Sequence, residues 1–440
     1  MVEVEQQPME VPAQQDQPEQ EAHEMQQEQM VDGQHPEQID FAELVKGDII
    51  QLYKEKSEQA GLQPHDAFIQ YLEETYDEND SIDIVIHGNH KYMFTDRITD
   101  DHLIVICATL ERYAIHIEEI DLRYNSITDM GARALGDLIS KSVRLLNLNL
   151  MGNQIKSEGA QYLAEALKEC PALQSLNFNM NKIKTGGAMM VTELLFTHDK
   201  LLSLSLGNNK IDHDGIIGIL SVLNSSNFTL EELNIDNPVY RTICQSVAIH
   251  FGKMFQNNVG LQKLSVQKHL LRDDGIYIMM EHLLENNTLK VLDLNANEIS
   301  FRGCEAIAKY LKGENCTLES LHLANNKCSD YGAKAISQAL AVNKSLVHLD
   351  MTYNNVNDLG LTFLAQSLKQ NLTLMSFKLF GNHFGQESLR LFCEIFEDER
   401  ENPFFPDFVV YFVDDHFEMA YHETNIENET DLGLDIYVNK

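Results

Sequence analysis

The segment LLNLNLMGNQI at residues 145–155 decides the fold, because its spacing of apolar residues and asparagine returns along most of the chain. Its leucines alternate with polar residues, which is typical of a short strand with one buried face. Adjacent complete copies lie 28 or 29 residues apart. The other complete copies are IEEIDLRYNSI (117–127), LQSLNFNMNKI (173–183), LLSLSLGNNKI (201–211), LKVLDLNANEI (289–299), LESLHLANNKC (318–328), LVHLDMTYNNV (346–356) and LMSFKLFGNHF (374–384).

A helical pattern follows each of these strands. In seven of the eight complete copies a glycine stands six residues after the asparagine, as at Gly159, and apolar residues follow it four and eight positions later, as at Leu163 and Leu167. This spacing places one apolar stripe on a helix of about three turns. One strand and one helix cannot bury their apolar faces alone, but stacked copies can. The pattern therefore predicts an α/β solenoid shaped like a horseshoe, with a parallel sheet inside and helices outside.

The recurring asparagine has a predicted structural role where each strand turns outward. Its side-chain amide can satisfy backbone groups that the turn leaves unpaired. We expect these side chains to form a ladder through the array. Its members are Asn125, Asn153, Asn181, Asn209, Asn297, Asn326, Asn354 and Asn382.

Two copies in the middle of the array lack this asparagine. LEELNIDNPVY (230–240) has Pro238 at that position, and LQKLSVQKHLL (261–271) has His269. Ordinary drift between repeats is one interpretation, and a local change of curvature that shapes a binding site is the other. With a diverged first copy at 81–93, about eleven copies fill residues 81–393.

The pattern resembles the leucine-rich repeat, in the class of 28–29 residues seen in ribonuclease inhibitor, Ran GTPase-activating protein and NOD-like receptors. The resemblance covers roughly residues 81–393 and implies binding of a protein partner on the concave sheet. Within this class, the chain resembles a group of non-enzymatic repeat proteins. The resemblance is carried by four stretches, LQPHDAFIQYLEE (62–74), SIDIVIHGN (81–89), RITDDHLIVICATL (97–110) and PDFVVYFVDDHFEMAY (406–421). That resemblance implies a nuclear, nucleolar and cytoplasmic factor linked to stem-cell or germ-cell differentiation.

The ends of the chain differ from the repeats. Residues 1–38 form a Gln/Glu-rich acidic tail that is expected to be disordered, since it has too little apolar surface to offset the cost of ordering. Residues 39–80 show two helical patterns and are predicted to cap the first strand. Residues 394–440 form an acidic cap with an alternating segment around Asp414 and Asp415 that predicts a β-hairpin.

The composition limits the classes of function. The net charge is −35, which argues against a protein that grips nucleic acid or an anionic membrane directly. The N-terminus lacks a secretory signal pattern, and seven scattered cysteines fit a reducing compartment. We expect an intracellular protein of the cytoplasm, the nucleus or both.

The sequence lacks the common catalytic and metal-binding motifs. It has no phosphate-binding loop, no nucleophile elbow and no H-E-x-x-H sequence. Cys304, Cys316 and Cys328 are twelve residues apart and are predicted to lie at different depths of neighbouring repeats rather than in a zinc site. We expect no cofactor, no metal and no enzymatic activity.

The central outward-facing residue of each strand is the predicted partner-binding surface, the alternative being a merely solubilising row. These residues are polar and mostly short, which suits hydrogen bonding to a folded protein. They are Asp121, Asn149, Asn177, Ser205, Asn234, Ser265, Asp293, His322, Asp350 and Lys378.

Lysines gather on one loop edge of three consecutive copies, at Lys156, Lys182, Lys184 and Lys210. They are either solvated loop residues or a site where an acidic segment docks. The chain's own N-terminal tail is one candidate for that segment. For the whole protein, two further functions stay open. The resemblance to the Ran activators implies a small-GTPase-activating protein, and repeats of this type also occur in structural subunits of ciliary axonemal complexes.

Overall fold

The computed structural model describes residues 46–75, 81–89, 97–240, 245–397 and 404–422. The predicted tail at 1–38 and the segments at 398–403 and 423–440 lie outside these residues. The unit that begins at Lys46 contains one twelve-stranded sheet in which the strands follow one another in chain order. The strands are β1 (Ile82–Val85), β2 (Ile117–Asp121), β3 (Asn147–Asn149), β4 (Ser175–Asn177), β5 (Ser203–Ser205), β6 (Glu232–Asn234), β7 (Lys263–Ser265), β8 (Val291–Asp293), β9 (Ser320–His322), β10 (His348–Asp350), β11 (Ser376–Lys378) and β12 (Phe405–Pro406).

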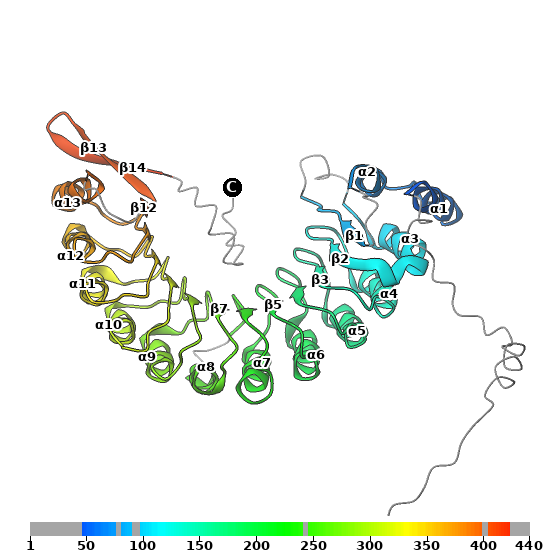
Figure 1. Cartoon of the computed structure of the whole chain (residues 1–440), viewed down its shortest axis with the longest axis horizontal. Coiled ribbons are helices and arrows are strands. Elements are labelled where there is room, and N and C mark those ends of the chain that lie inside the picture. The colour runs from blue at the N-terminus through cyan, green and yellow to red at the C-terminus, as the bar shows by residue number, and fades with distance from the viewer. Residues whose placement is uncertain (1–45, 76–80, 90–96, 241–244, 398–403, 423–440) are drawn as a thin grey trace, which may run out of the picture. The chain divides into compact units, whose positions relative to one another are not determined.

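Helices alternate with these strands and cover one face of the sheet. Figure 1 shows the strands on the inner side and the helices on the outer side of this unit. All eleven neighbouring strand pairs are parallel. This arrangement confirms the predicted leucine-rich repeat solenoid. The repeat helices are α3 (Asp100–Leu110), α4 (Asp129–Ile139), α5 (Ser157–Leu167), α6 (Lys184–Thr197), α7 (His213–Ser225), α8 (Gln245–Asn257), α9 (Arg272–Leu283), α10 (Phe301–Leu311), α11 (Ser329–Leu340), α12 (Asp358–Leu368) and α13 (Gln386–Glu397).

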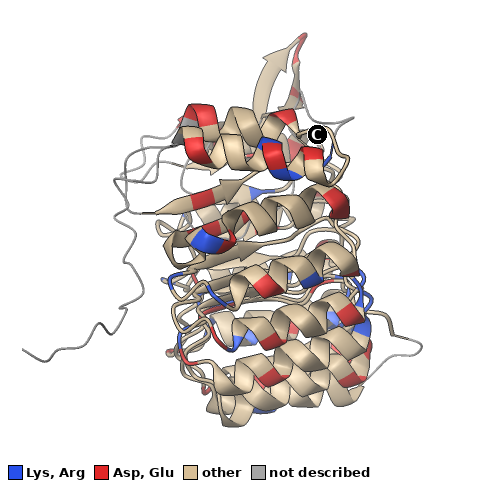
Figure 2. Ribbon diagram, turned by 90° about the vertical axis from the view of Figure 1, so that its right-hand side faces the viewer, with Lys and Arg blue, Asp and Glu red and all other residues tan. Residues whose placement is uncertain are grey.

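The leucines of the repeat form a continuous core between the sheet and the helices. Leu148 on β3 and Leu163 on α5 are both almost fully buried. Figure 2 shows Lys/Arg and Asp/Glu interspersed along the helices on the side that it presents. Each helix in the described part of the chain is too short or too polar to cross a lipid bilayer.

The asparagine ladder runs through the turns at the strand ends. In the copy at 173–183, the Asn181 amide donates to the carbonyls of Leu150, Phe178 and Asn179, and its oxygen accepts from the Ile155 N–H. The residue before each ladder position has a positive φ, between 53° and 77°. Most of these residues are not glycine, so their left-handed backbone is maintained by the ladder bonds around them. They are Tyr124, Gly152, Met180, Asn208, Asn237, Lys268, Ala296, Asn325, Tyr353 and Gly381.

His269 takes the place of asparagine in the turn that follows β7. Its Nε2 donates to the Ile235 carbonyl at 2.9 Å, and its backbone N–H donates to the Asn297 side chain. Its Nδ1 accepts from the Tyr240 hydroxyl at 3.0 Å. Burial lowers the pKa of His269 to about 4, so the ring is neutral at pH 7. His269 thus makes the bond to the preceding copy that asparagine makes in other copies, as Asn297 does to Val266.

A second row of asparagines closes the opposite ends of the repeats. In the copy that begins at Leu374, the Asn371 amide donates to Leu340 and Asn343, and its oxygen accepts from the Thr373 and Leu374 N–H groups. These asparagines are buried, and most stand in N-x-S/T sequences. The row comprises Asn227, Asn258, Asn286, Asn343 and Asn371.

The ends of the described solenoid carry other elements. Helices α1 (Lys46–Gln59) and α2 (Asp66–Thr75) precede β1, and a 3₁₀ segment, η2 (Glu111–His116), leads into β2. A hairpin of β13 (Phe408–Val413) and β14 (His416–Tyr421) follows β12. Asp414 and Asp415 both have positive φ, as a two-residue turn of this kind requires.

Candidate functional site

The ten residues predicted to face a partner form one continuous row across the sheet. The strand register pairs each of them with the next, from Asp121 on β2 to Lys378 on β11. Neighbouring strands lie about 4.8 Å apart. A folded ligand a few strands wide can therefore touch several members of the row at once.

Burial divides this row into accessible and inaccessible members. Asp121, Ser265, Asp293 and His322 are at most 8% exposed and lie among other side chains. The remaining six are partly exposed, namely Asn149, Asn177, Ser205, Asn234, Asp350 and Lys378. The accessible members therefore fall into two groups, one on β3–β6 and one on β10–β11.

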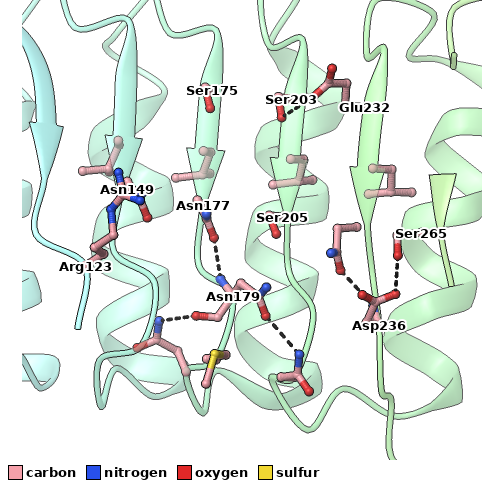
Figure 3. Close-up of a pocket in the computed structure, with 18 of the residues that line it drawn as sticks. Arg123, Asn149, Ser175, Asn177, Asn179, Ser203, Ser205, Glu232, Asp236 and Ser265 are labelled. Atoms are coloured by element: carbon pink, nitrogen blue, oxygen red, sulfur yellow. Dashed lines mark hydrogen bonds between the residues drawn. The ribbon is translucent and has the colours of Figure 1, made fainter. Parts of the chain in front are cut away.

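The group on β3–β6 lies in a groove of about 910 Å³. We call its strand side chains the polar floor (Figure 3). Two residues of each strand face the groove, since strand side chains alternate. The polar floor consists of Asn147, Asn149, Ser175, Asn177, Ser203, Ser205, Glu232 and Asn234.

Several polar-floor groups have unused hydrogen-bonding capacity. Asn177 accepts from the Asn179 N–H at 2.9 Å, but its amide N–H groups have no partner among the described residues. The same holds for the Asn147 side chain and for the hydroxyls of Ser175 and Ser205, as far as the described chain extends. A partly exposed row of free amides and hydroxyls can bind the backbone and polar side chains of another protein.

The acidic residues around the groove are mostly engaged. Asp121 accepts from Arg123 and from the Asn149 amide, and it pairs with His87. Burial by itself raises the pKa of Asp121, but the hydrogen bonds from His87 and Arg123 outweigh it and lower the pKa. Glu232 pairs with Lys263 and accepts from the Ser203 hydroxyl.

Two buried carboxyls lie side by side at the far end of the groove. Asp236 accepts from the Ser265 hydroxyl at 2.7 Å (Figure 3) and from the Gln267 N–H at 2.7 Å. Asp293 accepts from the Gln267 side chain and the Asn295 N–H. Burial raises the pKa of Asp236, and burial together with the Asp236 charge raises the pKa of Asp293 well above its usual value. Neither carboxyl presents a fully exposed negative charge.

Lysines stand along one rim of the same groove. Lys182, Lys210 and Lys268 line it, and Lys156 and Lys184 stand beside it where α5 and α6 begin. We call these five residues the lysine edge. All five are exposed, and none has an ion pair with another described residue. The sequence pattern grouped only four of them, because the copy that holds Lys268 lacks the usual asparagine.

Sequence reasoning missed half of the polar floor. Asn147, Ser175, Ser203 and Glu232 occupy the other outward position of each strand. The two-residue alternation of the strand is a signal that could have identified them. Nothing in the linear sequence indicated that Asp121 and Asp293 would be buried, because that depends on residues from neighbouring copies.

The cysteines and histidines do not assemble into a metal centre within the described chain. Cys304 and Cys328 are both fully buried and lie next to each other, although their separation in sequence predicted different depths. Cys316 is elsewhere and accepts from Ser345. Three possible ligands converge at Asp212, His213 and Asp214, but Asp212 already accepts the N–H groups at the start of α7.

Comparison with known proteins identifies the repeat. The family described as "Leucine Rich repeat" matches residues 113–136, 145–164, 285–308, 314–337 and 342–365. Leucine-rich repeat-containing protein 34 of Mus musculus is 30% identical over 233 residues, which are 47% of this chain and 49% of that protein. The Rattus norvegicus protein of the same name is 31% identical over 44% of this chain and 47% of its own.

Two other comparisons cover smaller parts of this chain. NACHT, LRR and PYD domains-containing protein 14 of Mus musculus is 29% identical over 27% of this chain and 11% of its own. A solved tropomodulin C-terminal domain of Caenorhabditis elegans superposes with a TM-score of 0.30 at 13% identity, over 35% of this chain and 91% of its own. This chain spans about half the length of the first relatives named. The repeat matches and the stacked strand–helix units agree: this chain carries leucine-rich repeats and folds as a leucine-rich repeat solenoid.

Proposed function

We propose that this chain is a non-enzymatic scaffold that binds a folded partner protein on the polar floor. The unused amides and hydroxyls of Asn147, Ser175, Asn177 and Ser205 carry the proposal. They stand on three neighbouring strands in one register, so a rigid partner can meet them together. Their chemistry suits hydrogen bonding more than charge pairing, since the nearby acids are engaged.

The second accessible group extends this surface. Asp350 and Lys378 pair in register on β10 and β11, and both are partly exposed. The Asp350 carboxylate accepts from the Thr352 N–H and hydroxyl, both at 2.8 Å, which fixes its position. A ligand that spans the sheet would meet a neutral floor first and a charged pair farther along.

The test places bulk and charge on the floor without touching the core. Ser175→Arg with Ser205→Arg fills the groove, whereas Gln161→Arg with Gln338→Arg adds the same charge on exposed helical positions. Proximity labelling in cells identifies partners, and the affinity of the purified chain for each is then measured. The floor variant is expected to lose at least tenfold in affinity, and the helical variant to keep it. The reverse result assigns binding to the outer helices and refutes the proposal.

The setting of this function rests on resemblance alone. We propose a nuclear, nucleolar and cytoplasmic factor in stem-cell or germ-cell differentiation, because the similarity to leucine-rich repeat-containing protein 34 supports that setting. Microscopy of the tagged chain in germ cells tests it. Exclusive recovery with purified axonemes would favour the axonemal alternative, and stimulated GTP hydrolysis by a small GTPase would favour the activator alternative.

A further inference from the structure

We propose that the lysine edge binds an extended acidic segment of the partner protein. The inference rests on the proposed function and names the chemistry of part of the ligand. The charge along this rim of the groove differs in sign from the net charge of the chain. The chain as a whole carries a net charge of −35, yet this rim presents exposed lysines without ion pairs among the described residues.

The lysines occupy equivalent positions in consecutive copies. Lys182 and Lys210 each follow a ladder asparagine directly, in two neighbouring repeats. Lys156 and Lys184 stand three residues after theirs, and the backbones of Lys156 and Lys182 form a parallel bridge. The repeat geometry therefore sets the ammonium groups in two short rows along one rim, where a single extended chain can follow them.

Two acids at this edge, Asp129 and Asp212, accept from backbone N–H groups at helix starts rather than from the lysine side chains. Asp129 accepts from the Lys156 N–H at 2.7 Å and from the Gly159 N–H at 2.9 Å, so it caps the start of α5. Asp212 caps the start of α7 in the same way. These carboxylates point at backbone groups and form no ion pair with the lysines of the described chain. Of the acids that line the groove, Glu232 is paired with Lys263, and Asp236 and Asp293 are buried.

The fold adds a second source of positive potential. Helices α5, α6 and α7 begin at this edge, and the start of each helix carries a partial positive charge. Met180 is 46% exposed beside Lys182 and Lys184 and offers an apolar contact between the charges. An extended peptide places alternate side chains about 7 Å apart on one side. Glutamates or aspartates at that spacing can meet successive lysines.

An acidic peptide fits this rim better than a nucleic acid. Binding of nucleic acid needs a surface that neutralises many phosphates, and its affinity falls steeply with salt. Here the basic groups are few, and Glu119, Asp121 and Glu232 line the same groove. A segment with separated carboxylates can reach the lysines while its other residues bond to the neutral floor.

The experiment measures binding of a fluorescein-labelled, glutamate-rich peptide to the full chain by anisotropy. Lys182→Gln with Lys210→Gln and Lys268→Gln removes the rim charges. The matched control is Lys253→Gln with Lys309→Gln and Lys312→Gln, three exposed lysines on or beside the helices. The rim variant is expected to lose at least tenfold in affinity, and the control less than twofold. Equal loss in both variants, or none in the rim variant, overturns the proposal.

Two further arms separate the other occupants. If a single-stranded RNA of matched length binds the rim more tightly than the peptide, the occupant is nucleic acid and the proposal fails. If removal of residues 1–40 tightens peptide binding tenfold, the occupant is the chain's own acidic segment rather than a partner. The native partner distinguishes this inference from the proposed function. If the native partner no longer binds the floor variant but still binds the rim variant, the proposed function stands and only the proposal for the lysine edge is refuted.

Discussion

The Nε2 of His269 donates to the carbonyl oxygen of Ile235 in the preceding copy, over 2.9 Å and 34 residues of sequence. The asparagine of other copies makes the same bond, as the Asn297 amide does to Val266. A carbonyl only accepts, so the proton is on Nε2 and Nδ1 is free to accept from Tyr240. The bond fixes the tautomer, and burial keeps the ring neutral at pH 7.

His269 therefore makes stability depend on pH. Its pKa is about 4 in the folded chain, below the ordinary 6.5 of a histidine that the unfolded chain exposes to water, so the unfolded state binds the proton more tightly. The contribution is fully present above pH 6.5 and is lost as the pH falls through this window. Between pH 7 and pH 5 the wild type should lose about 2 kcal/mol relative to His269→Asn, which does not titrate. Urea unfolding at both pH values measures it, and an unchanged difference would show that His269 does not titrate in this window.

The second asparagine row should matter as much as the first. Asn286 is buried, and its amide donates to the carbonyls of Phe255 and Asn258. Asn286→Ala leaves these groups and the Leu289 N–H unpaired and should cost about 1–3 kcal/mol of unfolding free energy. Asn287→Ala, at the exposed neighbouring position, should change it by less than about 0.5 kcal/mol. Similar values for the two variants would mean that this row does not stabilise the solenoid.

The repeat glycine should resist replacement by alanine, although alanine is the better helix former. A Cβ at Gly187 would lie 2.8 Å from the Ile183 Cβ and 3.0 Å from the Ala160 Cβ. Gly187→Ala should therefore destabilise the chain by about 1–3 kcal/mol through overpacking. At Gly186 the nearest atom is the Ser157 hydroxyl at 3.3 Å, so Gly186→Ala should be neutral or stabilising by up to about 1 kcal/mol. Thermal unfolding of both variants decides it, and a stable Gly187→Ala chain would contradict the close packing.

Asp407 should act in the opposite direction to His269. It is buried and accepts from the Leu379 and Phe380 N–H groups at the end of the repeats. Burial raises its pKa to about 6, above the ordinary 3.8 of an aspartate in water, so the folded state binds this proton more tightly. Its charge opposes folding above pH 6, and that cost disappears as the pH falls towards 3.8. Asp407→Asn should remove about 2 kcal/mol of this pH dependence, measured by unfolding between pH 4 and pH 7. An identical pH profile for the variant would show that Asp407 titrates normally.

The sequence by itself determined the architecture. Leucines every two or three residues in LLNLNLMGNQI and the glycine and apolar stripe after it specify a strand, a turn and a helix, and their period specifies the stack. These are local patterns, so they can be read from the chain directly. The outward direction of the Asn177 and Ser205 side chains follows from the same alternation, since it decides which side chains face away from the helices.

Only the tertiary structure decided which of those outward side chains a partner can reach. Asp293 is buried beneath Gln267 and beside Asp236, which come from two preceding copies. His269 can take the structural place of the ladder asparagine because the Ile235 carbonyl and the Tyr240 hydroxyl lie within hydrogen-bond distance of its two ring nitrogens. Each of these outcomes depends on contacts between residues about one repeat apart, in copies that differ in sequence. A single repeat fixes the direction of a side chain, but its neighbours fix its burial, its charge and its partners.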